Sequence, residues 1–195
     1  MGVHMNIKLA SKLITASFLL FANSSYSGNY YQSTPAQDAA DSVKKMQPLI
    51  GDWLCKRQVL QADGKWLTPE QTSRWEWRYT LNGHAVQDFW FPNATALSGA
   101  GMGTNLRVYD ANTDTWKMTW TFDKLASFQD FDAKFDAKSL VMNGDYPASG
   151  PNPAYKAQIT FYNITAKHFD WKFETSKLDD GKNWQEVLRL NCDKT

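Results

Sequence analysis

In two predicted strands, alternation places a polar side chain inside, whichever face points inward, namely Asp88 or Gln87 in one strand and Glu186 or Arg189 in the other. Asp88 alternates with valine and tryptophan, Gln87 on the opposite parity alternates with phenylalanines, and Glu186 alternates with leucines. A buried carboxylate needs a partner, which Arg107 or Arg189 can supply. We favour a structural ion pair for these groups, and the alternative is a polar anchor that orients a ligand.

Other residue sets that perform catalysis or bind metals are missing from the sequence. It contains no Ser–His–Asp or Cys–His set, no phosphate-binding loop and no dinucleotide-binding glycine pattern. Residues 110–114 have the carboxylate spacing of a calcium loop but lack its glycine and its distal glutamate. We therefore assign no catalytic residue, no metal ligand and no cofactor.

The charges of the 195-residue chain nearly cancel, with 21 Lys and Arg against 20 Asp and Glu. A nucleic-acid-binding protein normally has a basic excess, so we expect no nucleic-acid partner. The chain is instead rich in aromatic residues, with nine Trp, eight Tyr and eleven Phe. Such side chains either fill a core or line a cavity.

Residues 1–27 have the pattern of a secretory signal peptide, with two lysines, an apolar stretch over residues 13–22 and then small polar residues. The apolar stretch is shorter than the roughly 20 residues that a membrane-spanning helix needs. We predict export to the periplasm of a Gram-negative bacterium, with no integral membrane segment after processing. In that oxidising compartment Cys55 and Cys192 can form a disulfide.

Residues 28–48 are predicted to form a polar lead-in and one short amphipathic helix. Thr34 is suited to be its N-cap, Pro35 its first helical residue and Gln37 the end of a capping box. Pro48 would end the helix. The helix has one modest apolar stripe, suited to covering the end of another structure.

From Trp53 onward the apolar residues alternate with a period of two, which predicts β-strands. Asn82–Gly83 predicts a two-residue type I′ hairpin turn. About ten short strands make residues 49–195 a single all-β domain, and of sandwich and barrel we favour an antiparallel up-and-down barrel. After the strand that begins at Trp53, the predicted strands are 74–81, 84–91, 104–110, 115–122, 127–136, 139–143, 156–163, 168–175 and 184–191.

A ten-stranded barrel is wide enough to hold a small ligand, because eight strands already suffice. Its inward aromatic side chains either fill the core or form the wall of a site for an apolar or aromatic molecule. Arg107 with Asp88 or Gln87 would be the polar anchor of that site, and Glu186 is a further polar candidate. The wall residues that we predict are Trp75, Trp77, Trp120 and Trp171.

The sequence Ile50–Gly51–Asp52–Trp53 resembles the Gly-x-Trp start of lipocalin-like (calycin) barrels. The resemblance covers residues 49–189 and implies a barrel whose base is closed by Trp53, packed against a basic residue of the last strand, where Arg189 stands. Fold does not imply function, so it indicates no activity. Further stretches are similar to a bacterial family of small lipocalin-like barrels of undefined function, namely Trp75–Glu76–Trp77, 82–88, 103–110, Trp116, 164–171 and 179–184.

Such barrels are similar to nitrobindins, which bind haem through an axial histidine. After removal of residues 1–27, only His84 and His168 remain. His84 lies beside a predicted turn, and His168 shares the outward parity of Asp170 and Lys172. Neither histidine is expected to point into the barrel, so we do not expect haem as a ligand.

The resemblance also makes the first and last strands neighbours, so that Cys55 can meet Cys192. An antiparallel ladder that pairs these cysteines also pairs Trp53 with Lys194, which separates Trp53 from Arg189. In a regular ladder the disulfide and the contact between Trp53 and Arg189 therefore exclude each other, unless a bulge intervenes or Cys192 lies past the strand end.

The sequence as a whole predicts an exported barrel that binds a small apolar or aromatic molecule in its interior. Two alternatives remain. One is a cofactor-free enzyme of isomerase or cyclase type that uses Asp88 or Glu186 as acid–base. The other is a protein-partner module with a fully packed core.

Overall fold

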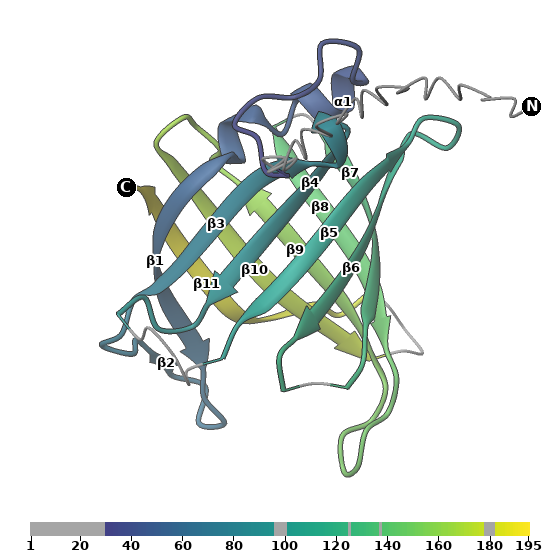
Figure 1. Ribbon diagram of the computed structural model, residues 1–195. Helices are drawn as coiled ribbons and strands as arrows, with labels where there is room; N and C mark the ends of the chain where they lie inside the picture. Colours follow the sequence, from purple (N-terminus) through teal and green to yellow (C-terminus); the bar gives the residue numbers. More distant parts are fainter. Residues whose placement is uncertain (1–29, 96–100, 125, 137, 178–181) are drawn as a thin grey trace, which may run out of the picture.

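The computed structural model describes residues 30–95, 101–124, 126–136, 138–177 and 182–195. The signal peptide predicted for residues 1–27 and the turn predicted at Asp180–Gly181 lie outside these residues. One antiparallel sheet curls into a barrel, and α1 (Asp41–Lys44) covers one end (Figure 1). The strands are β1 (Gly51–Leu60), β2 (Trp66–Leu67), β3 (Ser73–Thr80), β4 (Ala85–Phe91), β5 (Gly103–Asp110), β6 (Thr115–Phe122), β7 (Gln129–Asp136), β8 (Ser139–Tyr146), β9 (Tyr155–Tyr162), β10 (His168–Lys177) and β11 (Gln185–Lys194).

The barrel is closed by ten strands, which confirms the predicted fold class. From β3 to β11 each strand pairs with the next along the chain, β1 pairs with β3, and β1 also pairs with β11. The two-residue β2 pairs with the end of β1. The meander connectivity follows from the short turns between alternating strands, and closure removes the sheet edges that an open meander would expose.

A disulfide between Cys55 and Cys192 joins the first and last strands of the barrel. The cysteines are direct partners in the β1–β11 ladder, which therefore also pairs Trp53 with Lys194. Lys194 Nζ donates to the Ile50 carbonyl oxygen at 2.7 Å and lies 5.1 Å from the centre of the Trp53 ring. The basic partner of Trp53 is thus Lys194, whereas Arg189 pairs with Gln58 further along β1.

Gly51 makes this closure sterically feasible. Its φ of 135° lies in a region that residues with a Cβ rarely adopt, and a Cβ would lie 2.5 Å from Lys194 Cε. The glycine of the Gly-x-Trp sequence therefore allows the lysine to pass over Trp53. Trp53 itself is buried and donates from Nε1 to the Leu49 carbonyl oxygen at 2.8 Å.

The predicted helix over residues 34–48 is much shorter in the structure. It begins at Asp41 rather than after Thr34, and a 3-10 turn, η1 (Gln47–Leu49), follows. The preceding chain is pinned to the β3–β4 end of the barrel, because the backbone of Gln32 pairs with Tyr79 and Ala36 N donates to the Gly83 carbonyl oxygen. Those hydrogen bonds replace the ones that a first helical turn would make.

The connection between β3 and β4 also differs from its prediction. Thr80 pairs with Ala85, so four residues form the turn, not the two of a type I′ hairpin. Leu81, Asn82 and Gly83 all have positive φ, and together they form the short helix η2 (Leu81–Gly83). Asn82–Gly83 marks the turn correctly, but its length is set by the strand register.

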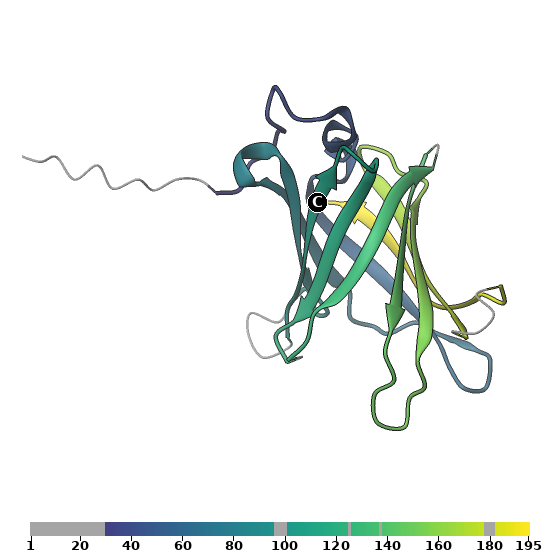
Figure 2. The same cartoon turned by 90° about the vertical axis from the view of Figure 1, so that its right-hand side faces the viewer.

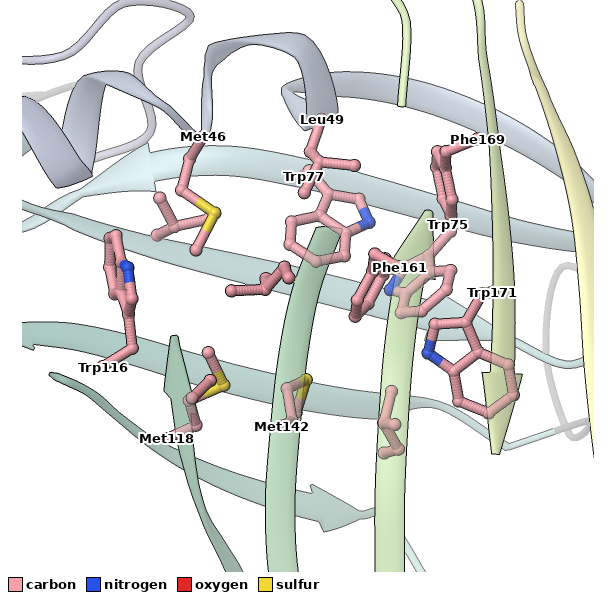
Figure 3. Close-up of a cluster of buried hydrophobic side chains, with 14 of the residues drawn as sticks. Met46, Leu49, Trp75, Trp77, Trp116, Met118, Met142, Phe161, Phe169 and Trp171 are labelled. Carbon is pink, nitrogen blue, oxygen red and sulfur yellow. The ribbon is translucent and has the colours of Figure 1, made fainter. Parts of the chain in front are cut away.

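The barrel interior is densely aromatic near the end that α1 covers. Met46 and Leu49 are fully buried there above Trp77 (Figure 3). Trp75 lies deeper in the barrel, with its ring centre 5.2 Å from that of Trp77 and 5.5 Å from that of Phe161. In the part of the chain that the structure describes, no helix covers the opposite end, and the β8–β9 hairpin extends beyond it (Figure 2). No helix of the described residues is long and apolar enough to cross a membrane.

Candidate functional site

An ion pair between Asp88 of β4 and Arg107 of β5 lies inside the barrel. Strand alternation turns both side chains inward, where Asp88 is 0% exposed and Arg107 1% exposed. Arg107 Nη1 donates a hydrogen bond to Asp88 Oδ2. The guanidinium carbon also lies 4.1 Å from the centre of the Trp77 ring, a cation–π distance. Of the interior pairings that the sequence allowed, the structure forms Asp88 with Arg107.

Burial dominates the electrostatics of this ion pair. It raises the pKa of Asp88 and lowers the pKa of Arg107, because each charged form loses its hydration inside the barrel. The charge of each partner opposes the shift of the other, and Trp75 also acts to lower the pKa of Asp88. Each charge thus depends on the other, and the Asp88 carboxylate is not free to act alone.

Asn105 extends this polar interior along β5. Its side chain is 4% exposed, and it lies directly opposite Asp88 on one side and Trp120 on the other. Arg107 Nη1 lies 3.5 Å from the Asn105 carbonyl oxygen, so the guanidinium reaches back toward Asn105. Three buried atoms, Asp88 Oδ1, Asn105 Oδ1 and Arg107 Nε, have no hydrogen-bond partner among the described residues. The cluster therefore has unused capacity for one more polar group.

A cavity of about 250 Å³ lies inside the barrel beside this cluster. Asn105 and Arg107 line it, and so does Arg57 of β1. Sites for small molecules commonly combine an apolar wall with a few polar groups, and this cavity has that composition. The aromatic part of its wall is Trp75, Trp90, Trp120, Phe131, Tyr146, Phe161, Trp171 and Phe173.

Side-chain exposure indicates where the cavity meets solvent. Trp77 and Phe169, near the end covered by α1, are fully buried. Trp90, Trp120 and Phe173, at the other ends of their strands, are only partly buried. The cavity is therefore closed toward α1 and reached from the uncovered end, where β4 ends and β5 begins (Figure 1).

Four of the eight predicted ligand-binding residues line the cavity, namely Trp75, Arg107, Trp120 and Trp171. Trp77 and Asp88 are buried in the barrel next to it but are not part of its wall. Trp77 instead stacks on Arg107, and Asp88 accepts a hydrogen bond from the same guanidinium. Both residues can therefore act on a ligand only through Arg107.

Gln87 and Glu186 lie away from the cavity. Gln87 donates from Nε2 to Thr104 Oγ1 at 3.1 Å, on the outer face that alternates with Asp88. Glu186 was expected to share the face of Leu188, but the β10–β11 ladder shifts register between Phe173 and Glu174. Glu186 consequently pairs with Glu174 on the outside of the barrel, which corrects the inward parity that simple alternation predicts.

Arg189, another residue singled out from the sequence, lies on the same outer face as Glu186. Its Nε atom lies 3.6 Å from Glu186 Oε1, and its guanidinium carbon lies 3.9 Å from the centre of the Trp66 ring. Trp66 belongs to β2, so Arg189 stabilises the short ribbon beside the barrel. The contact with Trp53 is made by Lys194.

Sequence reasoning missed Asn105 and Arg57 as cavity residues. Both were accessible to the parity argument, since Asn105 has the parity of Arg107, and Arg57 has the parity of Trp53 and Cys55. A polar residue at such a position suggests that the alternation of inward-facing side chains has ended. In β1 and β5 the alternation instead continues toward the uncovered end of the barrel.

The two histidines of the described residues lie outside the barrel and do not line the cavity. His84 lies 3.5 Å from Asp38, and His168 Nδ1 is 2.8 Å from Asp193 Oδ1. The hydrogen bond with Asp193 raises the pKa of His168, and Asp170, 3.4 Å from Nε2, acts in the same direction. Among the described residues no cluster of His, Cys, Asp or Glu is arranged to hold a metal ion.

Comparison with protein-family models gives no match for this chain, and comparison with curated protein sequences gives none either. The arguments for function therefore come from the barrel itself. Its ten antiparallel strands, closed between the first and the last, are consistent with a lipocalin-like fold.

Proposed function

We propose that this protein is a carrier that binds one small apolar or aromatic molecule inside its barrel, as a member of the small bacterial lipocalin-like barrels whose sequence features it shares. The cavity of about 250 Å³ with its largely aromatic wall is the observation that supports this most. A protein-partner module with a fully packed core would leave no such space. A cavity of about 150 Å³ holds benzene, so this one suits a guest of about ten non-hydrogen atoms.

The enzyme alternative has less support, because neither candidate carboxylate faces the cavity. Asp88 is bound to Arg107 and is not part of the wall, and Glu186 lies on the outer face. A general acid or base must come within hydrogen-bond reach of its substrate. Reversible binding requires no such group.

We further propose that the protein works in an oxidising compartment, the periplasm of a Gram-negative bacterium. The disulfide between Cys55 and Cys192 supports this, because such bonds persist mainly outside the cytosol. The signal-peptide pattern of residues 1–27 points the same way.

Calorimetric titration with naphthalene, after extraction of the purified protein with organic solvent, tests the carrier function. We expect one naphthalene per chain and a negative heat-capacity change of binding, the mark of apolar burial. Leu188→Trp should abolish binding, because Leu188 lines the cavity and a larger side chain would fill it. Thr160→Trp is the matched control, since Thr160 pairs with Lys172 on the outer face.

Failure of the wild-type protein to bind naphthalene would contradict the proposal, and so would equal binding by the Leu188→Trp variant. Mass spectrometry of the solvent extract gives an independent check. A stoichiometric apolar or aromatic compound in that extract is the expected result.

A further inference from the structure

The polar cluster inside the barrel is a continuous row across neighbouring strands. Trp77, Asp88, Asn105 and Trp120 lie directly opposite one another on β3, β4, β5 and β6. Residues opposite each other in antiparallel strands share a face, so all four side chains point into the barrel. Arg107, two residues along β5 from Asn105, folds against this row.

Within this row the ion pair leaves hydrogen-bonding groups without partners. Arg107 Nη1 is bound to Asp88, whereas the Arg107 Nε–H donor has no partner among the described residues, and neither does the acceptor Asn105 Oδ1. Both residues line the cavity and are at least nine-tenths buried. The unmet donor and the unmet acceptor therefore belong to two residues that line the same cavity, and buried groups of this kind are costly unless something satisfies them.

The charges of the row select the kind of group that can satisfy these atoms. Asp88 and Arg107 already neutralise each other in a region with little access to water. A charged guest group placed there would add an uncompensated buried charge, which is costly. A neutral group that both donates and accepts adds none.

We propose that the guest carries an uncharged hydroxyl group, which donates to Asn105 Oδ1 and accepts from Arg107 Nε while the aromatic wall holds the rest of the molecule. This inference rests on the carrier function proposed above and specifies its ligand class as a hydroxylated aromatic compound. With about ten non-hydrogen atoms, a fused two-ring phenol has the right size. Asp88 and Trp77 are positioning residues, since they hold the Arg107 guanidinium and do not line the cavity.

Arg57 offers the competing anchor, for an anionic guest. It lines the cavity and has no ion-pair partner among the described residues. Its Nε atom is also buried without a hydrogen-bond partner among the described residues, but the side chain as a whole is only partly buried, so its charge is more accessible to water than that of Arg107. Asn105 and Arg107 are more deeply buried than Arg57. Leaving their hydrogen-bonding atoms without partners therefore costs more free energy.

Titration with four probes of one ring system tests the inference. Naphthalene has no polar group, 2-naphthol has a hydroxyl that is uncharged at pH 7, 2-methoxynaphthalene accepts but cannot donate, and 2-naphthoate is anionic. We expect 2-naphthol to bind about tenfold tighter than naphthalene or 2-methoxynaphthalene, from one satisfied buried acceptor. It should also bind tighter than 2-naphthoate.

Asn105→Leu removes the acceptor at nearly constant size. It should abolish the preference for 2-naphthol over naphthalene, which is measured as the ratio of the two affinities in the same variant. Asn143→Leu is the control, because Asn143 is exposed on β8 and pairs with Gln158 on the outer face. If Asn105→Leu does not fold, the comparison of 2-naphthol with 2-methoxynaphthalene on the wild-type protein tests the same donated hydrogen bond.

The possible results separate this inference from the carrier function. Equal affinities for 2-naphthol and naphthalene would overturn the hydroxyl anchor and leave the carrier function standing. Tightest binding of 2-naphthoate, reduced by Arg57→Gln, would move the anchor to Arg57 and also overturn it. Binding of none of the four probes would overturn both.

Discussion

The interior ion pair gives a quantitative prediction for the substitution Asp88→Asn. The change keeps the shape of the side chain but removes the charge that balances Arg107 inside the barrel. Arg107 is 1% exposed, so its charge has little access to water. The variant should therefore fold less stably because it buries an unbalanced guanidinium.

The size of the loss follows from what remains around Arg107. Removing one partner of a buried ion pair costs about 3–5 kcal/mol. The Trp77 ring at 4.1 Å still attracts the cation, which keeps the expected loss near the lower end, about 3 kcal/mol. In a chain of this length 1 kcal/mol shifts Tm by about 2–4 °C, so Tm should fall by roughly 6–12 °C.

Urea denaturation followed by tryptophan fluorescence measures the free energy of unfolding of each variant. Asp132→Asn is the matched control, because Asp132 pairs with Lys117 at 2.8 Å and both side chains are more than half exposed. Surface pairs contribute at most about 1 kcal/mol. An Asp88→Asn loss as small as that of the control would refute the assigned role of the buried pair.

Two other stability effects are expected. Replacing both Cys55 and Cys192 by serine should lower the free energy of unfolding by roughly 4 kcal/mol, since the disulfide closes a loop with a sequence separation of 137; equal urea midpoints for the variant and the oxidised protein would contradict this. The folded-state pKa of His168 is raised above 6.5 by Asp193 and Asp170, so its stabilising effect is complete below pH 6.5 and is lost as pH rises through the raised pKa. Urea midpoints between about pH 5 and 9 should therefore converge for wild type and His168→Gln at the alkaline end, and a constant difference would argue against it.

The sequence left two alternatives for barrel closure, a disulfide between Cys55 and Cys192 or a contact between Trp53 and Arg189, and the structure has the disulfide. Once Cys55 is set opposite Cys192, the ladder places Lys194 opposite Trp53, as the structure has it. The same reasoning explains why Arg189 cannot be the partner of Trp53. In a regular antiparallel ladder, one known residue pair fixes the partners of all the other residues in both strands.

Alternation fails where the ladder itself is irregular. The register shift between Phe173 and Glu174 moves Glu186 to the outer face, and nothing in the local sequence of β11 marks it. The length of the N-terminal helix could not be predicted from its own sequence either. The backbone of Gln32 and Ala36 forms hydrogen bonds with Tyr79 of β3 and Gly83 of the β3–β4 turn, which are distant in sequence. Both misses arise from contacts made outside the segment in question.

The position of the ion pair along the barrel links its stability to binding. Apolar side chains of similar volume often replace a buried ion pair at no cost, so stability alone does not explain why Asp88 and Arg107 are charged. A role in orienting a guest explains it, because the pair holds Arg107, whose Nε–H, like the Asn105 side-chain oxygen, has no partner in the described part of the chain and belongs to a residue that lines the cavity.

The double variant Asp88→Leu/Arg107→Met separates the role of the ion pair in stability from its role in binding. It should recover most of the stability lost in Asp88→Asn and still bind naphthalene, but bind 2-naphthol no better than naphthalene. A double variant that keeps the preference for 2-naphthol would show that the charges serve the fold alone.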